Sequence, residues 1–317
     1  MPTGQRLQQA GNRGLHLVRT RPGVAAAAAA LVVTLAIAYG SVVASLVRDW
    51  ATDDNYSHGF LVVPVIAYLV WRQRDVWGRT DRTPSSIGLL LVLGSLGLYV
   101  GGLLGAELFL TRISLVGVVA GSLVFLFGWR HLRLLAFPLA LTLLIIPLPA
   151  IIFNQITFPL QLVASWCGET ALSAVGVPVL REGNVITLST TSLYVAEACS
   201  GIRSLVSLLT LALLYGYFTD PRGWVRAALA AASIPTAVLA NGARVAGTGI
   251  AASVIGPEAA EGVLHTFSGW MVFVVALVLL LLMKRALVWV AGPPARRPAR
   301  SGAMNAEGPL AGDRPVL

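Results

Sequence analysis

The sequence predicts an all-α polytopic integral membrane protein with about eight transmembrane helices and a small extracytoplasmic β-hairpin. Of its 317 residues, 56% are hydrophobic and only 12% are charged, and the mean hydropathy is +0.77. Soluble domains carry about 25% charged residues. Here long apolar runs alternate with short Arg-rich segments, which is the pattern of a chain that crosses a bilayer several times.

The transmembrane helices are predicted from eight apolar runs, most of them about 17–25 residues long. They cover residues 24–47, 58–71, 86–104, 108–127, 134–152, 199–218, 224–248 and 265–283. A further segment, 153–176, is apolar but is interrupted by Asn154, Gln155, Gln161 and Glu169. It is either another span or a helix that lies in the membrane interface.

The loop charges decide between these two alternatives. Eight spans place both termini on one side, and that side then holds 18 of the 23 basic residues, which makes it cytoplasmic. Nine of the 14 acidic residues fall on the other face. A ninth span would divide the basic loops between both sides. We therefore predict that 153–176 lies in the interface, in a protein of the cell membrane with both termini cytoplasmic.

Three regions follow from this topology: a basic cytoplasmic N-terminus (1–22), a transmembrane domain (23–290) and a disordered cytoplasmic tail (291–317) rich in Pro, Gly and Ala. The apolar run after residue 22 is too long for a signal-peptide core, so it is read as the first span. Residues 177–198 alternate apolar and polar side chains around Glu182-Gly183-Asn184, which predicts the outer β-hairpin.

The composition also limits the partners. The net charge of +9 arises from cations beside apolar runs, which the positive-inside rule explains, so the bilayer and not nucleic acid is the predicted partner. Two cysteines, Cys167 and Cys199, are too few for a disulfide framework or a cysteine zinc site. No metal or other cofactor is predicted.

Three chemically useful residues reach the outer ends of three consecutive spans: Cys199, Arg244 and His265. A thiol is a strong nucleophile as the thiolate, and a nearby base or cation lowers its pKa. A helix N-terminus favours the thiolate at Cys199, His265 can take its proton, and Arg244 offers donors for an oxyanion. The trio therefore predicts a nucleophilic site on the extracytoplasmic face.

Several neighbours have a supporting or an open role. Arg203, four residues after Cys199, either tunes the thiolate or pairs with Glu197. His58, in the first outer loop, either joins the site or forms a hydrogen bond at the interface. Cys167 is either a small buried apolar residue or a disulfide partner of Cys199. For Arg112, inside a span, a functional role and a structural ion pair are equally open.

Four sequence stretches resemble the exosortase/archaeosortase family of membrane transpeptidases. They are Ala-Cys-Ser-Gly-Ile-Arg at 198–203, Ala-Asn-x-x-Arg at 240–244, which contains Asn241, His-x-x-x-Gly at 265–269, and Asn55-Tyr56-Ser57-His58-Gly59 followed by Pro64. The resemblance spans roughly residues 50–285. It implies that Cys199 is the nucleophile and that Arg244 and His265 complete the site.

The resemblance also implies the substrates: exported, membrane-anchored proteins with a C-terminal sorting signal made of a short motif, a membrane helix and a basic cluster. Two other function classes are weighed against it, a membrane transporter and a non-catalytic assembly factor in exopolysaccharide or protein export. A transporter would show internal repeats or interrupted helices near the membrane midplane; neither is evident in the sequence, and the notable residues collect at one face.

Overall fold

The computed structural model describes residues 22–189, 192–195, 201–256 and 262–292, with the backbone alone for 22–32, 262–266 and 291. The predicted termini 1–22 and 291–317 thus lie almost wholly outside the described residues. The helices are α2 (Pro22–Thr52), α3 (Gly59–Arg72), α4 (Arg74–Arg79), α5 (Ile87–Leu104), α6 (Leu108–Leu126), α7 (Trp129–Leu144), α8 (Ala150–Ala174), α9 (Ile202–Thr219), α10 (Gly223–Ile255) and α11 (Gly262–Ala291). The strands are β1 (Val179–Glu182), β2 (Val185–Leu188) and β3 (Ser192–Tyr194).

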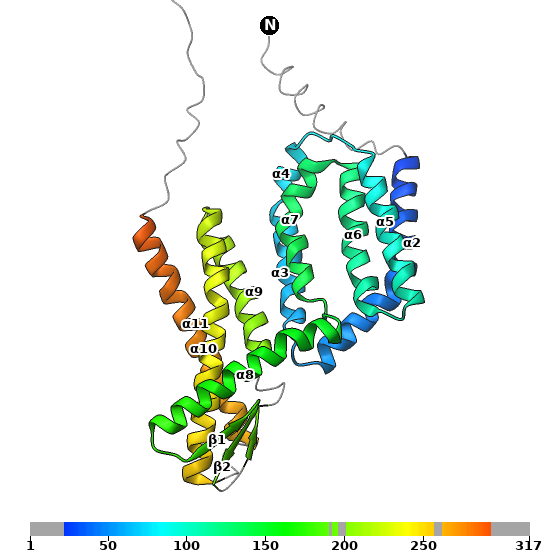
Figure 1. Cartoon of the computed structure of the whole chain (residues 1–317). Helices are drawn as coiled ribbons and strands as arrows, with labels where there is room; N and C mark the ends of the chain where they lie inside the picture. Colours follow the sequence, from blue (N-terminus) through cyan, green and yellow to red (C-terminus); the bar gives the residue numbers. More distant parts are fainter. Residues whose placement is uncertain (1–21, 190–191, 196–200, 257–261, 293–317) are drawn as a thin grey trace, which may run out of the picture.

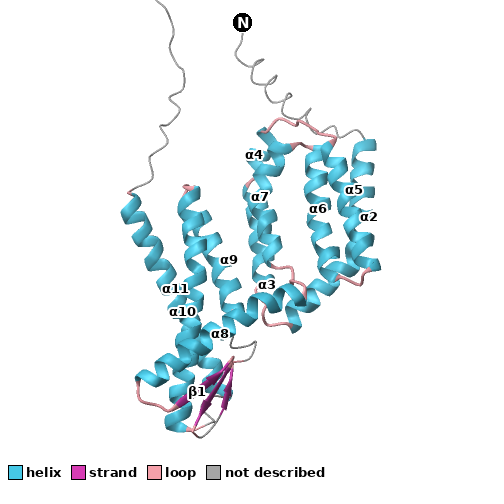
Figure 2. Ribbon diagram, in the orientation of Figure 1, coloured by secondary structure: helices cyan, strands magenta, loops and turns pink. Residues whose placement is uncertain are grey.

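The helices run alternately between two ends of the molecule, except α8 and the short α4 (Figure 1). Helix α8 lies across the others beside the strands, at what we term the sheet end (Figures 1 and 2). Helix α2 begins and helix α11 ends at the opposite end (Figure 1). This arrangement matches the predicted alternation of spans and the transverse orientation predicted for 153–176.

Six of the described helices are long and apolar enough to cross a membrane: α5, α6, α8, α9, α10 and α11. Helix α8 meets this criterion by length and composition, although it lies across its neighbours in Figure 1. Helices α3 and α7, with 14 and 16 residues, are shorter than the roughly 20 residues of a typical span. The chain is a multi-pass membrane protein.

Some predicted boundaries were wrong. Helix α7 ends at Leu144 instead of residue 152, and α8 begins at Ala150. The reason is Pro147 and Pro149, because proline lacks the N–H that a continuing helix needs. Helix α10 continues to Ile255, seven residues beyond the prediction, and the short helix α4 was not predicted.

The predicted hairpin is confirmed, with β1 and β2 antiparallel around Gly183, whose φ is 64°. A third strand, β3, pairs with β2 and was not predicted. The sheet is attached to α8 by an ion pair of 2.6 Å between Arg181 and Glu169. A 3.0 Å hydrogen bond from the Asn184 amide to Gln161 adds to it. Two of the polar residues that interrupt 153–176 therefore serve to hold the sheet.

Two groups of helices meet in the middle of the molecule. Helix α5 packs closely on α6, whereas α10 packs on α8, α9 and α11. The groups are joined where the rings of Phe137 in α7 and Tyr217 in α9 stack, with centroids 3.9 Å apart. A buried cluster from α2, α3 and α7, including Trp50 and Leu141, extends this contact.

The close contact of α5 with α6 yields a test of the fold. A Cβ at Gly88 would overlap the backbone of Phe125 and lie 2.7 Å from the Gly121 carbonyl oxygen, whereas one at Gly97 would meet nothing within 4 Å. We expect Gly88→Ala to lower the free energy of unfolding by about 1–3 kcal/mol through overpacking. Gly97→Ala is the matched control and should be neutral or slightly stabilising. Thermal unfolding of both variants in detergent measures the difference; equal stability would contradict the packing.

Candidate active site

One turn of α10, residues 241–245, is contacted by three other helices. The start of α9 contacts it at Asn241. A Cβ added to Gly201, the N-cap of α9, would lie 2.8 Å from both Cβ and Cγ of Asn241. Gly201 also has φ 78°, a conformation that glycine adopts without strain. Both features require glycine at the residue that follows Cys199-Ser200.

Arg244, three residues further along the same turn of α10, lies against α11. A Cβ added to Gly269 would lie 3.1 Å from Cζ and Nη2 of Arg244, so the guanidinium occupies the space that a larger residue would take. Arg244 itself is half-buried. His265 precedes Gly269 by four residues in α11, which places it on the same face of that helix one turn earlier. Its side chain is not among those described.

Helix α8 reaches the same turn of α10 from another direction. A Cβ at Gly242 would lie 2.8 Å from Cβ and 2.9 Å from Sγ of Cys167. One at Gly168 would lie 2.8 Å from Cγ1 of Val245. Cys167 is half-buried and forms no disulfide with a described residue. Its predicted alternative, a bond to Cys199, involves a residue outside the described ranges.

Arg203 has a partner that the sequence did not indicate. Its Nη2 lies 3.0 Å from Oδ2 of Asp54, which directly precedes the Asn55–Gly59 stretch. The predicted partner, Glu197, lies outside the described residues. Both side chains of the observed pair are largely exposed, so the pair adds little stability. The pair connects the first outer loop to the beginning of α9.

The first outer loop is held against the segment that follows α7. The indole Nε1 of Trp50 donates to the Ile145 carbonyl at 2.8 Å, and the Leu148 amide donates to the Tyr56 hydroxyl at 3.0 Å. Nε2 of His58 lies 3.3 Å from the carbonyl oxygen of Leu144. Burial lowers the pKa of His58, just before α3, although the backbone contacts act in the opposite direction. His58 thus forms a hydrogen bond to the last residue of α7, and which of its two predicted roles it has stays a prediction.

The structure describes some of the predicted site residues more fully than others. Arg244 and Asn241 are described with their side chains, and His265 with its backbone alone. Cys199 and Glu197 fall within 196–200, outside the described residues. The stretches that contain Cys199, Arg244 and His265 do meet, through Gly201 on Asn241 and Gly269 on Arg244. Contact among the three side chains stays a prediction.

Comparison with known proteins agrees with this architecture. The family model described as transmembrane exosortase matches residues 50–282, a range that contains all four stretches singled out in the sequence. No curated protein and no solved structure gives a significant match. Since the family match covers most of the chain, this protein belongs to the transmembrane exosortase family.

Proposed function

We propose that this chain is a membrane-embedded cysteine transpeptidase or protease that cleaves a C-terminal sorting signal from exported, membrane-anchored proteins. The observation that carries the proposal is the packing of Gly201 on Asn241 and of Gly269 on Arg244. It joins the three stretches that supply a thiol, a guanidinium and an imidazole. Family membership supports a role in membrane transpeptidation and protein sorting in general terms.

The proposed reaction has two halves. His265 takes the Cys199 thiol proton, and the thiolate forms a bond to the carbonyl carbon of the scissile peptide. Arg244 stabilises the oxyanion that develops, since fixed donors near such a charge lower the barrier. The C–N bond then breaks, and the leaving amine takes the proton from His265. An amine or water attacks the resulting thioester, gives its proton to His265, and releases the product and the Cys199 thiol.

The distribution of charge supports an active site on the extracytoplasmic face. The basic loops belong to the end opposite the sheet, which the positive-inside rule makes cytoplasmic. Helix α8 packs on α10 at Gly242 and Val245, so Arg244 lies level with this transverse helix. A substrate helix with a cytoplasmic basic cluster would then present its preceding motif to Arg244.

Replacing each member of the trio tests the mechanism. We expect Cys199→Ala to abolish processing of a co-expressed substrate with such a signal. Arg244→Ala should lower the rate by roughly 10²–10³-fold, and His265→Ala by roughly 10²–10⁴-fold. Gel analysis of membranes measures processing, with insertion of each variant checked. Trapping of a thioester on the wild type completes the test, whereas wild-type cleavage by Cys199→Ala would favour the assembly-factor or transporter alternative.

The glycine at the start of α9 offers a second test that leaves the trio intact. Gly201→Ala strains a left-handed backbone position and collides with Asn241, which shifts the chain next to Cys199. A misplacement of about 1 Å costs roughly 10²-fold in rate, so we expect a loss of that order. Gly247→Ala in α10, where an added Cβ meets nothing within 4 Å, is the control. Similar processing rates for the two variants would argue against the proposed geometry.

Thiol labelling tests the orientation in the membrane. Tyr194→Cys in β3 and Asp81→Cys between α4 and α5 are placed singly at exposed positions, after both native cysteines are replaced by serine. A membrane-impermeant maleimide should label Tyr194→Cys in cells whose outer barrier is opened but whose cell membrane is intact. Asp81→Cys should react only after that membrane is permeabilised. The reverse pattern would invert the topology and remove the active site from the outer face.

A further inference from the structure

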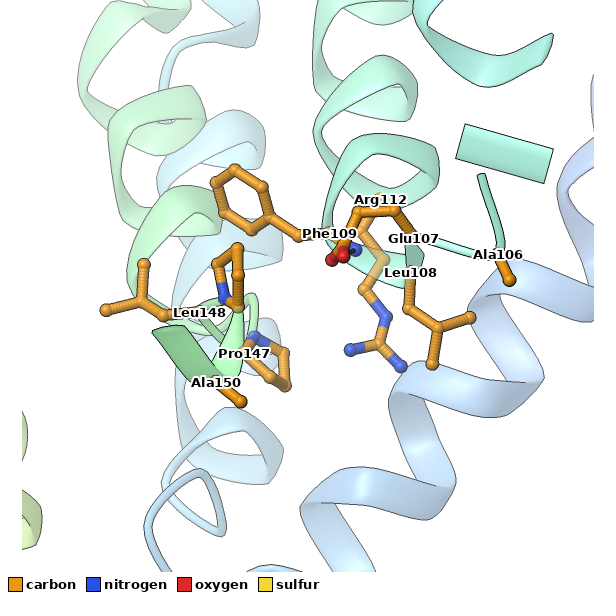
Figure 3. Close-up of a pocket in the computed structure, with 9 residues that line it drawn as sticks. Ala106, Glu107, Leu108, Phe109, Arg112, Pro147, Leu148 and Ala150 are labelled. Carbon is orange, nitrogen blue, oxygen red and sulfur yellow. Dashed lines mark hydrogen bonds between the residues drawn. The ribbon is translucent and has the colours of Figure 1, made fainter. Parts of the chain in front are cut away.

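A pocket of about 220 Å³ opens at the sheet end of α6, apart from the Arg244 turn of α10. One wall is the start of α6 with the preceding residues, and the other is the proline-containing segment between α7 and α8 (Figure 3). The lining is mostly apolar, with two charged side chains, Glu107 and Arg112. The proposed reaction makes no use of it.

Arg112 is almost wholly buried, with 3% of its surface exposed. Its Nη2 donates to Asp49 in α2 at 2.6 Å and to the Ser45 hydroxyl at 3.4 Å. Its Nε is also buried and has no hydrogen-bond partner within the described part of the chain. An unpaired N–H of a buried cation is costly. Nε itself has almost no exposed surface, so an incoming acceptor meets Arg112 through the part of its side chain that lines the pocket.

The second charged group sets the chemistry of the ligand. Glu107 caps α6 by accepting a 3.4 Å bond from the Phe109 amide, which leaves acceptor capacity on its carboxylate. Together Glu107 and Asp49 outweigh the one charge of Arg112, so a simple anion is disfavoured. A fitting ligand offers an acceptor to Arg112 and a donor to Glu107, with apolar groups for Phe109 and Leu148. A peptide group with its side chains has this combination.

The pocket is connected to the candidate active site through the first outer loop. The Leu148 amide in the pocket wall donates to the Tyr56 hydroxyl at 3.0 Å. Two residues earlier, Asp54 pairs with Arg203, which is two residues beyond Gly201 in the stretch that holds Cys199. We propose that this pocket is a subsite for an extended segment of the substrate polypeptide, whose backbone bonds to the Arg112 guanidinium and Glu107. This inference rests on the proposed function.

Kinetics and photo-crosslinking together test the subsite. Glu107→Gln removes the charge that receives the peptide N–H, and Ala150→Phe fills the pocket, so each should raise KM roughly tenfold with kcat nearly unchanged. Ile151→Phe is the control, since Ile151 is exposed and outside the lining. Arg112 is left intact because its removal would leave the Asp49 carboxylate without its ion-pair partner. In Cys199→Ala protein, benzoylphenylalanine at Phe109, but not at Ile151, should crosslink the co-expressed substrate.

Each outcome is decisive. A substrate adduct at Phe109 with raised KM supports the subsite, and an adduct without cleavage by the wild type keeps the subsite while rejecting the proposed reaction. An adduct with the mass of a phospholipid and an unchanged KM makes the pocket a lipid site and overturns the inference. Cleavage by the wild type with no adduct and unchanged KM overturns the subsite alone. Neither cleavage nor adduct rejects both.

Discussion

The close approach of three helices to one turn of α10 is the constraint on which the candidate site depends. Helices in lipid associate through close packing, because burial from water offers no driving force between them. Small residues make that packing feasible here: Gly201 against Asn241, Gly242 against Cys167 and Gly269 against Arg244. A larger residue at Gly201 or Gly242 would collide with the Cβ of the facing residue, and one at Gly269 would press on the Arg244 guanidinium. The depth and spacing of the site are therefore properties of the packing of α10.

Loop charges and turn residues predict much of the fold from the sequence. The excess of Arg on alternate loops predicted the alternation of spans and the transverse helix 153–176. It could do so because loops rich in Lys and Arg lie on the cytoplasmic side of a membrane. Gly183 marked the hairpin turn. The third strand was missed because Ser192–Tyr194 is too short to show a periodic pattern. The Asp54–Arg203 pair was missed because its members lie far apart in the sequence and belong to no shared motif.

The depth of the candidate site was also only partly predictable. The sequence placed Arg244 near the end of its span, but α10 continues 11 residues further, about 16 Å of helix. This extension packs on α8, where a Cβ at Gly249 would lie 2.8 Å from Leu172, and Ala252 joins the buried cluster beneath the sheet. Such tertiary support leaves no signal in the local hydropathy. Arg244 consequently lies beside Gly269 of α11, between residues of α10 that contact α8, instead of at an open helix end.

Arg112 and Arg244, two of the arginines inside the helices, bear on the choice between an enzyme and a transporter. A charged residue within a span usually marks a functional or paired site, and a transport path places such groups near the membrane midplane. Arg112 is only four residues from the start of α6, at the sheet end, and is paired with Asp49. Arg244 lies level with α8, at the same end. Because both arginines, the first outer loop and the pocket gather at one end, the arrangement favours chemistry at a membrane surface over passage through it.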